Sequence, residues 1–213
     1  MVRTMGEMIF LGARRLTKTL NDILEFSELE SGNYELKSIE FDLLELVREI
    51  CELNDDDLRK KPVTLTCSCS HSSINIKLDT FIYRRVLENI VGNSIKFTAE
   101  GNIHISVELS GNHSGYLIYI DVSDTGPGVD DMEIGLMFEE FRQISEGINR
   151  QYEGSGLGLS IVKHYLKRLG GRVEILSSKG EGSVFRLIFP VRSEFSLGEP
   201  CNDELFWSSK PQE

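Results

Sequence analysis

Three clusters rich in glycine, asparagine and aspartate are the parts of the sequence whose residue types and spacing could do chemistry. The first, residues 88–98, has the spacing of a helix whose polar face carries Arg85, Asn89, Asn93 and Lys96. An asparagine amide oxygen is a neutral ligand suited to Mg²⁺, and a nearby lysine can neutralise phosphate charge. A polar helix face in water would explain the same residues. The residues on the opposite, core-facing side are Leu87, Ile90, Val91 and Ser94.

The second cluster, Asp124–Gly128, directly follows an apolar stretch that predicts a strand at 116–123. A carboxylate at the end of a strand, beside glycines that allow a ligand to approach closely, could accept a hydrogen bond from an exocyclic amine. Aspartate, glycine and proline are also the expected residues of a tight turn. Taken alone, this cluster fits both interpretations.

The third cluster, residues 153–163, places Gly154, Gly156 and Gly158 at the start of an apolar helix. Backbone N–H groups and the positive end of the helix dipole would converge there on an anion. The cluster is not a Walker loop, because Lys-Ser/Thr does not follow the glycines, and no strand leads into it as a dinucleotide fingerprint requires. A helix start with small residues for close packing is the alternative.

The segment 129–153 separates the second cluster from the third and lacks regular hydrophobic periodicity. A loop of that length inside a compact domain is typical of a lid or a binding loop. Phe138 and Phe141 lie three residues apart within it and could pin such a lid to the core. Ordinary core packing would explain this pair equally well.

The composition limits the classes of protein that these clusters could serve. The chain has 213 residues and a formal net charge of −11, which argues against a general nucleic-acid binder. No apolar run approaches the ~20 residues that span a bilayer, so we expect no membrane segment. Four cysteines are too few for a disulfide scaffold, which favours a reduced, cytoplasmic protein.

The elements that must position the clusters are a mixture of helices and strands. Helices are expected at 2–31, 42–53, 79–96 and 156–169, and strands at 63–69, 74–78, 102–109, 116–123, 172–178 and 183–191. A seven-residue repeat in the first helix predicts an apolar seam that one helix cannot bury alone, formed by Ile9, Ala13, Leu16, Leu20 and Ile23. We expect three parts: this helix over 1–32, a domain over 33–192 and a polar tail over 193–213.

In this order the clusters resemble the motifs of the ATP-binding half of sensor histidine kinases, within the gyrase, chaperone and histidine kinase ATPase superfamily. The similarities are Asn89–Thr98 to the N box, Asp124–Gly128 to the G1 box, Phe138–Phe141 to the F box and Gly154–Gly158 to the G2 box. Residues 16–32 resemble the second helix of the kinase dimerisation and phosphotransfer hairpin. The resemblance implies an α+β fold, a two-layer α/β sandwich whose mixed sheet is covered by helices on one face, after a long amphipathic helix.

The resemblance also implies an ATP site with Mg²⁺ as cofactor. Asn93 would ligate Mg²⁺, while Asn89 and Lys96 would contact phosphate or metal-bound water. Asp124 would receive the adenine amino group, with Phe97 stacked on the ring. The other residues that the resemblance assigns to the ATP site are Gly126, Gly128, Phe141, Gly154, Ser155, Gly156, Leu157, Gly158 and Ser183.

The reaction implied by the resemblance is γ-phosphoryl transfer from Mg·ATP to a histidine, with 129–153 as the ATP lid. In the family the phosphoacceptor histidine lies on the helix before the second hairpin helix, a setting that this chain offers to none of His71, His104, His113 and His164. We therefore expect the ATP-binding catalytic portion of a two-component protein-histidine kinase that lacks its own phosphoacceptor. Its partners would be the acceptor helix of the same or a sister chain and a response-regulator receiver domain, and the first helix leaves room for a homodimer.

Two other functions stay open on sequence alone. An ATP-hydrolysing relative needs a general base for water, and in those ATPases a glutamate occupies the position that here is Asn89, whose amide cannot act as a base. Glu88 is adjacent but points about 100° away around the helix. The other alternative is a catalytically silent nucleotide-binding or docking module. The intact clusters weigh against such a module, and the missing acceptor helix weighs for it.

Overall fold

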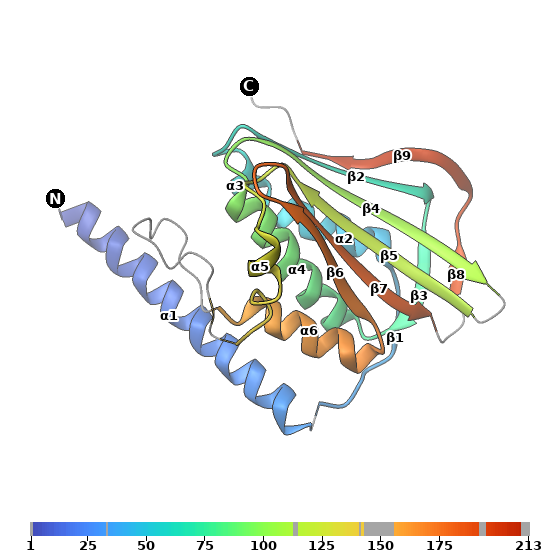
Figure 1. The fold of residues 1–213 in the computed structure, drawn as a ribbon, viewed down its shortest axis with the longest axis horizontal. Helices are drawn as coiled ribbons and strands as arrows, with labels where there is room; N and C mark the ends of the chain where they lie inside the picture. The colour runs from blue at the N-terminus through green and yellow to red at the C-terminus, as the bar shows by residue number, and fades with distance from the viewer. Residues whose placement is uncertain are drawn as a thin grey trace.

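A computed structural model of the chain describes residues 2–32, 34–112, 115–140, 142, 156–191 and 195–209. The order of elements runs from a long helix through a mixed α and β domain to two C-terminal strands (Figure 1). No helix within these ranges is both long and apolar enough to cross a membrane.

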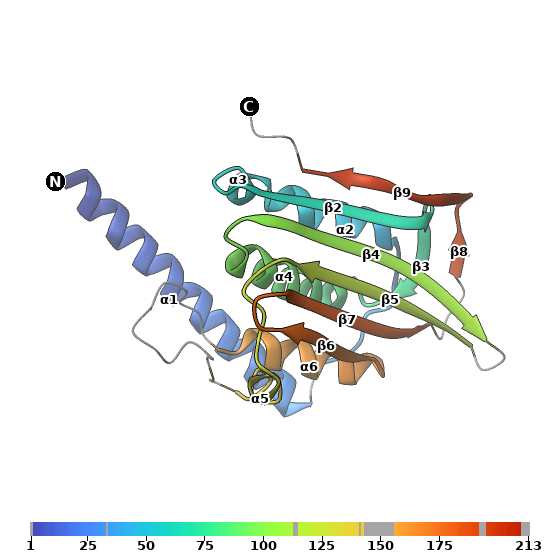
Figure 2. The same ribbon diagram turned by 45° about the horizontal axis from the view of Figure 1, so that its top comes forward.

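Helix α1 (Val2–Ser31) confirms the long helix predicted from the N-terminal repeat. Gly32 follows it with a φ of 76°, a left-handed conformation that glycine adopts without a Cβ penalty. The C-terminal part of α1 docks on the domain through the buried side chains of Phe26 and Leu29. The N-terminal half extends away from the domain (Figures 1 and 2).

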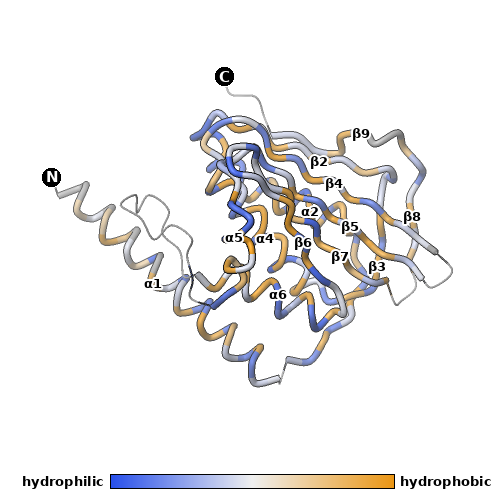
Figure 3. The backbone as a smooth tube through the Cα atoms, in the orientation of Figure 1, coloured by the Kyte–Doolittle hydropathy of each residue, from blue (hydrophilic) through white to orange (hydrophobic). Residues whose placement is uncertain are grey.

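The seam that predicted a partner helix remains exposed, because α1 turns a different face toward the domain. The seam residues Ile9, Leu16, Leu20 and Ile23 are between 41% and 67% exposed. Apolar bands recur along the length of α1 in Figure 3. The docked face carries Asp22 and Phe26, which are both buried. The chain by itself therefore leaves the predicted seam without a covering helix among the described residues.

A six-stranded mixed sheet forms the centre of the domain, in the order β6-β7-β5-β4-β2-β9 (Figure 1). Strands β2 and β4 are parallel, and the other neighbours are antiparallel. The bounds are β2 (Val63–His71), β4 (Gly101–Asn112), β5 (Gly115–Asp124), β6 (Arg172–Ser178), β7 (Gly182–Val191) and β9 (Pro200–Ser208).

Helices cover one face of this sheet, which confirms the predicted two-layer α+β sandwich (Figure 2). The helices are α2 (Leu43–Leu53), α4 (Thr80–Phe97) and α6 (Gly158–Leu169), with the short α3 (Asp55–Leu58) and α5 (Asp131–Ile134). Ile90 of α4 and Ile161 of α6 are fully buried in one core with Phe189 of β7. Burying each such side chain stabilises the fold by about 1.5–3 kcal/mol.

A second, three-stranded sheet lies at one end of the domain. Its order is β1-β3-β8, and both pairings are antiparallel. The bounds are β1 (Ile39–Asp42), β3 (Ile74–Leu78) and β8 (Phe195–Leu197). The sequence predicted β3 but neither β1 nor β8.

The structure corrects the prediction of a polar tail over 193–213 for the part that it describes, 195–209. Strand β8 extends the small sheet, and β9 pairs with β2, whose edge would otherwise be open. Phe195 packs edge-on against Tyr116, with 4.7 Å between ring centroids, and Trp207 packs against the core. Phe195 and Trp207 are partly buried although the segment around them has a polar composition. Composition alone does not predict the pairing of this segment with distant strands.

Candidate functional site

Helix α4 carries the first cluster and begins at a well-formed cap. The side chain of Asp79, 3% exposed, accepts hydrogen bonds from the Ile82 N–H at 3.1 Å and the Lys37 N–H at 2.8 Å. An aspartate cap stabilises a helix by about 1 kcal/mol. As predicted, α4 buries Leu87, Ile90, Val91 and Ser94, while Arg85, Asn89, Asn93 and Lys96 are half-buried.

Asn89 lies where α4 meets the start of α6. Its side-chain N–H donates to the Arg85 carbonyl at 2.8 Å, and its amide oxygen faces Gly158. A Cβ at position 158 would lie 2.8 Å from that oxygen, closer than real Cβ atoms come. A side chain at position 158 would therefore displace the Asn89 amide from the place it has here.

The first turn of α6 is suited to an anion. Its N-cap residue is Leu157, whose apolar side chain cannot accept a hydrogen bond from the helix N–H groups. Gly156 precedes it with a φ of 74°, which lets the chain turn sharply into the helix. Uncapped N–H groups at a helix start, together with the helix dipole, favour a bound phosphate or carboxylate.

The carboxylate of Asp124 is half-buried at the end of β5 and held by hydrogen bonds. Oδ2 accepts from the Ser94 hydroxyl at 3.1 Å, and Oδ1 accepts from the Gly126 N–H at 3.0 Å. Burial raises the pKa of Asp124, and the bonds from Gly126, Ser94 and the Ser183 N–H oppose that rise. In its ionised form, a half-buried carboxylate of this kind is an acceptor for an N–H donor of a ligand.

Two glycines hold the turn that carries Asp124 against the β6–β7 hairpin. Gly182 has a φ of 91°, and a Cβ there would lie 2.0 Å from the Asp124 carbonyl oxygen. Gly128 has a φ of 62°, and a Cβ there would lie 1.9 Å from the Ser178 carbonyl oxygen. Contacts that glycine alone permits therefore fix the backbone of the second cluster.

Lys96 and Phe97 form the end of α4. Burial lowers the pKa of Lys96, and the positive charge of Lys18 on α1 lowers it further. The Lys96 ammonium lies 4.8 Å from the centroid of the Phe97 ring. A half-buried cation beside a second cation gains from an anionic ligand, and the Phe97 ring is 37% exposed and so accessible to another ring.

Ser183 lies at the Asp124 end of the site. Residues 183 and 124 are directly paired between β7 and β5. The Ser183 hydroxyl is hydrogen-bonded to the Ser177 hydroxyl at 2.9 Å, so its contribution to the carboxylate is the backbone N–H.

Several predicted positions lie outside the described residues. These are Phe141, Gly154 and Ser155, together with 143–153 of the predicted lid. In the described part of the lid, Asp130 caps α5 by accepting from the Met132 N–H at 3.2 Å. The F box and the first residues of the G2 box therefore remain predictions.

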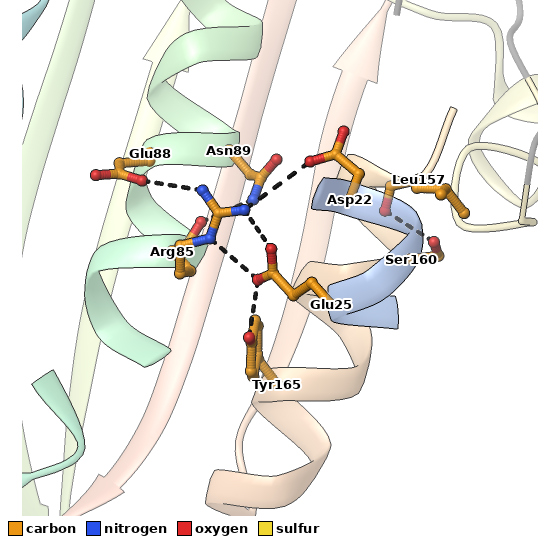
Figure 4. A network of polar contacts seen from close by, with 8 residues as sticks. All are labelled: Asp22, Glu25, Arg85, Glu88, Asn89, Leu157, Ser160 and Tyr165. Carbon is orange, nitrogen blue, oxygen red and sulfur yellow. Dashed lines mark hydrogen bonds and ion pairs between the residues drawn. The ribbon is translucent and has the colours of Figure 1, made fainter. Parts of the chain in front are cut away.

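An ion-pair cluster that the sequence did not predict joins α1 to α4 and α6 (Figure 4). Arg85 binds Glu25 through two of its nitrogen atoms, with Nε at 3.0 Å from Oε1. The same guanidinium lies 3.3 Å from Glu88 and 3.9 Å from Asp22. The Tyr165 hydroxyl of α6 donates to Glu25 at 2.8 Å. We call these five residues the α1 junction.

The α1 junction is partly withdrawn from water. The side chains of Asp22 and Glu25 are 8% and 13% exposed. The hydrogen bond to Glu25 raises the pKa of Arg85, so the guanidinium stays charged at any physiological pH. Glu25 and Arg85 lie 60 residues apart, and such a pairing has no local sequence signature.

A groove of about 630 Å³ lies between α1 and α4 beside the junction. Three basic residues, Arg14, Lys18 and Arg85, line it with one acidic residue, Asp22. Because Arg85 is one helical turn before Asn89, the groove borders the face of α4 that carries the predicted phosphate contacts. A basic lining favours phosphate groups. Asp124 does not line this groove, so the carboxylate and the basic groove are separate parts of the site.

The comparisons with known proteins agree with this arrangement. Residues 79–193 match the family model described as histidine kinase-, DNA gyrase B- and HSP90-like ATPase. The chain is 32% identical over 197 residues to an uncharacterized sensor-like histidine kinase of Rhizobium meliloti, covering 92% of this chain and 37% of the relative. It is 33% identical over 191 residues to the autoinducer 2 sensor kinase/phosphatase LuxQ of Vibrio parahaemolyticus, covering 88% of this chain and 22% of the relative.

A solved structure shares the fold of this chain. The crystal structure of full-length ShkA in complex with AMPPNP superposes with a TM-score of 0.77 at 28% identity, covering 90% of this chain and 40% of that chain. The chain thus spans well under half of ShkA and of both of these relatives. From the family match, the relatives and the site, the chain belongs to the histidine kinase-, DNA gyrase B- and HSP90-like ATPase family and contains the catalytic ATP-binding domain of a sensor histidine kinase.

Proposed function

We propose that the chain binds Mg·ATP between α4, the turn after β5 and the start of α6, and delivers its γ-phosphate to a histidine outside the described residues. The observation that carries the proposal is the half-buried Asp124 carboxylate, which is held by three neutral donors, one of them Ser94 on the buried face of α4. The relative solved with AMPPNP, ShkA, supports an adenine nucleotide as the ligand.

Asp124 is the group that recognises the base by hydrogen bonding. An ionised carboxylate accepts a hydrogen bond from the exocyclic amine of adenine, whereas the carbonyl of guanine would place a second acceptor against it. That mismatch leaves two hydrogen-bond acceptors facing each other at a partly buried position, which costs free energy of binding. Phe97, with its exposed ring, would stack on the base.

The phosphates would lie toward Asn89, Lys96 and the first turn of α6. The N–H groups of that turn and the Lys96 ammonium supply the positive partners that a triphosphate needs. The approach of Asn89 to Gly158 leaves no room for a side chain at the point where the two elements meet. These contacts position the nucleotide, and in phosphoryl transfer positioning and charge neutralisation account for most of the catalysis.

The residues present fit a bound Mg²⁺ held mainly by the nucleotide. Among the described residues, no three His, Cys, Asp or Glu side chains gather into a metal site. Mg²⁺ in phosphoryl-transfer sites uses few protein oxygens and takes the rest from phosphates and water. We assign the protein ligand to the amide oxygen of Asn93, with Asn89 on phosphate or metal-bound water. Bound Mg²⁺ would neutralise charge on the phosphates.

The transfer forms a bond between a histidine ring nitrogen and the γ-phosphorus and breaks the bond from that phosphorus to the β,γ-bridging oxygen, so ADP leaves. An acidic residue beside the acceptor histidine takes the ring proton. Among the described histidines, the ring of His104 is hydrogen-bonded to Thr66 and Ser68, and His164 packs against Phe26, so neither serves as acceptor. The acceptor would come from the hairpin helix of the same or a sister kinase chain.

The other partners follow from the same proposal. The exposed seam of α1 is suited to a homodimer in which the seam packs against other hairpin helices. A response-regulator receiver domain would take the phosphate onward, and the need for ATP favours a cytoplasmic site. The helix over 1–32 and a domain that begins at 33 belong to this proposal too, and the pairing of β9 with β2 supports including β9 in that domain.

The test is phosphate transfer from γ-labelled ATP to a separately supplied helical hairpin that bears a histidine and an adjacent acidic residue. We expect transfer that requires Mg²⁺ and falls about a hundredfold in Asn93→Ala, the size typical for loss of a metal contact. Asn75→Ala, in the small sheet, is the matched control and should transfer normally. Equal transfer by Asn93→Ala would contradict the ligand assignment.

Two results would favour the alternatives. ATP binding without transfer to any supplied histidine would favour a silent nucleotide-binding module. Steady ATP hydrolysis that is lost in Glu88→Gln would favour an ATP-hydrolysing relative, because Glu88 would then be acting as the base for water.

A further inference from the structure

Ser94 is a polar residue on the buried face of α4, where its neighbours are apolar. It is 1% exposed, between the buried Val91 and Ile95. A hydroxyl at such a position costs stability unless it is hydrogen-bonded. Its partner is Oδ2 of Asp124, at 3.1 Å across 30 residues of sequence. The buried face of the first cluster therefore contacts the carboxylate of the second.

Ser94 supplies a side-chain donor to a carboxylate that is otherwise held by backbone. Oδ1 of Asp124 accepts from the Gly126 N–H at 3.0 Å, and the Ser183 N–H is the third donor. The two backbone donors belong to the turn and to the β5–β7 pairing, whose position is fixed by Gly182. Rotation of the carboxylate about its Cβ–Cγ bond would break both the Ser94 bond to Oδ2 and the Gly126 bond to Oδ1, so these two donors together select its orientation, and Ser94 is the side chain of the two.

The surroundings of Asp124 contain no charged partner among the described residues. The groups that face it are Ser94 from α4, Ile103 from β4, Gly126 from its own turn and Ser183 from β7, and none of them is charged or titrates in the ordinary pH range. Burial disfavours the ionised form, and hydrogen bonds alone oppose it. Each donor therefore affects both the geometry and the ionisation of the carboxylate.

A second hydroxyl lies near this carboxylate, on the residue that caps the C-terminus of α4. Thr98, one turn after Ser94, is fully buried, and its hydroxyl has no hydrogen-bond partner among the described residues. A Cβ at Gly126 would lie 2.8 Å from Asp124 Oδ1 and 3.5 Å from Thr98 Oγ1. Both oxygens therefore border one small volume, which only the absence of a side chain at position 126 keeps open.

We propose that Ser94 is a positioning residue for the base: its hydroxyl holds the Asp124 carboxylate in the orientation that receives the exocyclic amine, and so sets the preference for adenine over guanine. This inference rests on the proposed function of the same site. Ser94 acts through Asp124 and makes no contact with the reacting phosphate.

The experiment measures affinity for a non-hydrolysable ATP analogue and the matching GTP analogue across pH, in the unchanged chain and in Ser94→Ala. We expect Ser94→Ala to bind the ATP analogue about tenfold more weakly, the size of a lost hydrogen bond to a charged group. The ratio of the affinity for the ATP analogue to that for the GTP analogue should fall toward one. Ser94→Thr, which keeps the hydroxyl, should recover most of both.

The pH profile separates positioning from a purely structural role. Binding requires the ionised form, so it weakens as the pH falls through the pKa of Asp124. Removing a donor to the ionised form raises that pKa, so the acid limb of Ser94→Ala should move to higher pH. The ¹³C chemical shift of the Asp124 carboxyl in the ligand-free chain should report the same displacement. Tyr83→Phe, which removes another buried hydroxyl of α4, is the control and should change neither readout.

Three outcomes would overturn the inference. If Ser94→Ala keeps the affinity and pH profile of the unchanged chain, or loses affinity with no displacement of the acid limb, Ser94 does not position the carboxylate. If the unchanged chain binds and Asp124→Asn does not, while Ser94→Ala binds normally, this inference fails and the proposed function stands. If the unchanged chain binds no adenine nucleotide, both fail together.

Discussion

The Asp124 end of the site and the α1 junction are both partly buried polar clusters, yet they are built in opposite ways. Asp124 is held by neutral donors from Ser94, Gly126 and Ser183, all within the domain that carries it. The α1 junction centres on a charged guanidinium, Arg85, and its main partner, Glu25, lies on a different part of the chain. One cluster lies wholly within the domain, and the other connects the domain to a helix.

This difference predicts which cluster can lose its contacts while the contacts of the other remain. A hydrogen-bonded carboxylate inside a sheet and helix layer changes little with ionic strength. Ion pairs between two elements weaken as salt screens them. The α1 junction is therefore the part of the molecule at which the domain could separate from α1, while the Asp124 pocket stays formed.

Gly182→Ala should have the largest effect of these substitutions. It should disturb the turn that carries Asp124 and leave the contacts of the α1 junction in place. A Cβ at this position, with φ of 91°, would lie 2.0 Å from the Asp124 carbonyl oxygen, so β5 or β7 must move. We expect a loss of about 3 kcal/mol in unfolding free energy and of at least tenfold in nucleotide affinity. Urea unfolding and calorimetry measure the two.

Gly92→Ala is the matched control for that change. Gly92 is inside α4, and a Cβ there would meet nothing within 4 Å. Alanine should stabilise the helix by about 1 kcal/mol and leave nucleotide affinity unchanged. A Gly182→Ala chain that is as stable as the unchanged one would contradict the account of the turn.

Arg85→Ala should act on the α1 junction and on the basic groove that Arg85 also lines, and not on the Asp124 end of the site. It leaves the Glu25 and Asp22 carboxylates, 13% and 8% exposed, without their cation. We expect the docking of α1 to weaken by about 3 kcal/mol, which corresponds to roughly a hundredfold faster amide hydrogen exchange over residues 22–31.

Salt should imitate this substitution in part, because it screens the same pairs. Raising the salt concentration of the unchanged chain should speed exchange over residues 22–31, and the affinity of the Asp124 pocket for nucleoside should change less than threefold. Unchanged exchange in Arg85→Ala would mean that Phe26 and Leu29 hold α1 without the ion pairs.

Tyr165→Phe should produce the smallest change. It removes one hydrogen bond, from the Tyr165 hydroxyl to Glu25 at 2.8 Å, and leaves the Arg85 pair in place. We expect a loss of about 1 kcal/mol, read as roughly fivefold faster exchange in the last turns of α1. A loss as large as that of Arg85→Ala would show that the tyrosine and not the guanidinium centres the junction.

The sequence predicted the parts of the site that depend on local geometry. The period of the α4 helix separated the buried Leu87, Ile90, Val91 and Ser94 from the half-buried polar face, and the structure confirms that division. The position of Asp124 at the end of a strand followed from the apolar stretch before it, and β5 ends at that residue.

What the sequence did not predict depends on contacts between distant segments. The pairing of Arg85 with Glu25 and the bond from Ser94 to Asp124 cross 60 and 30 residues. Strand β9 pairs with β2 across a longer separation, within a segment whose composition predicts a polar tail. A hydroxyl in an otherwise apolar set, as at Ser94, is the one local sign that such a contact exists.

The most direct test of the central claim, that Asp124 receives the adenine, is calorimetric titration with Mg²⁺ and a non-hydrolysable ATP analogue. The chains compared are the unchanged protein, Asp124→Asn and, as control, Asp121→Asn. Asp121 lies on the same strand as Asp124, and its carboxylate is paired with Arg186 of β7. The account predicts binding by the unchanged chain and Asp121→Asn, and at least a hundredfold weaker binding by Asp124→Asn. Equal affinity of all three would contradict it and would move the base away from the turn after β5.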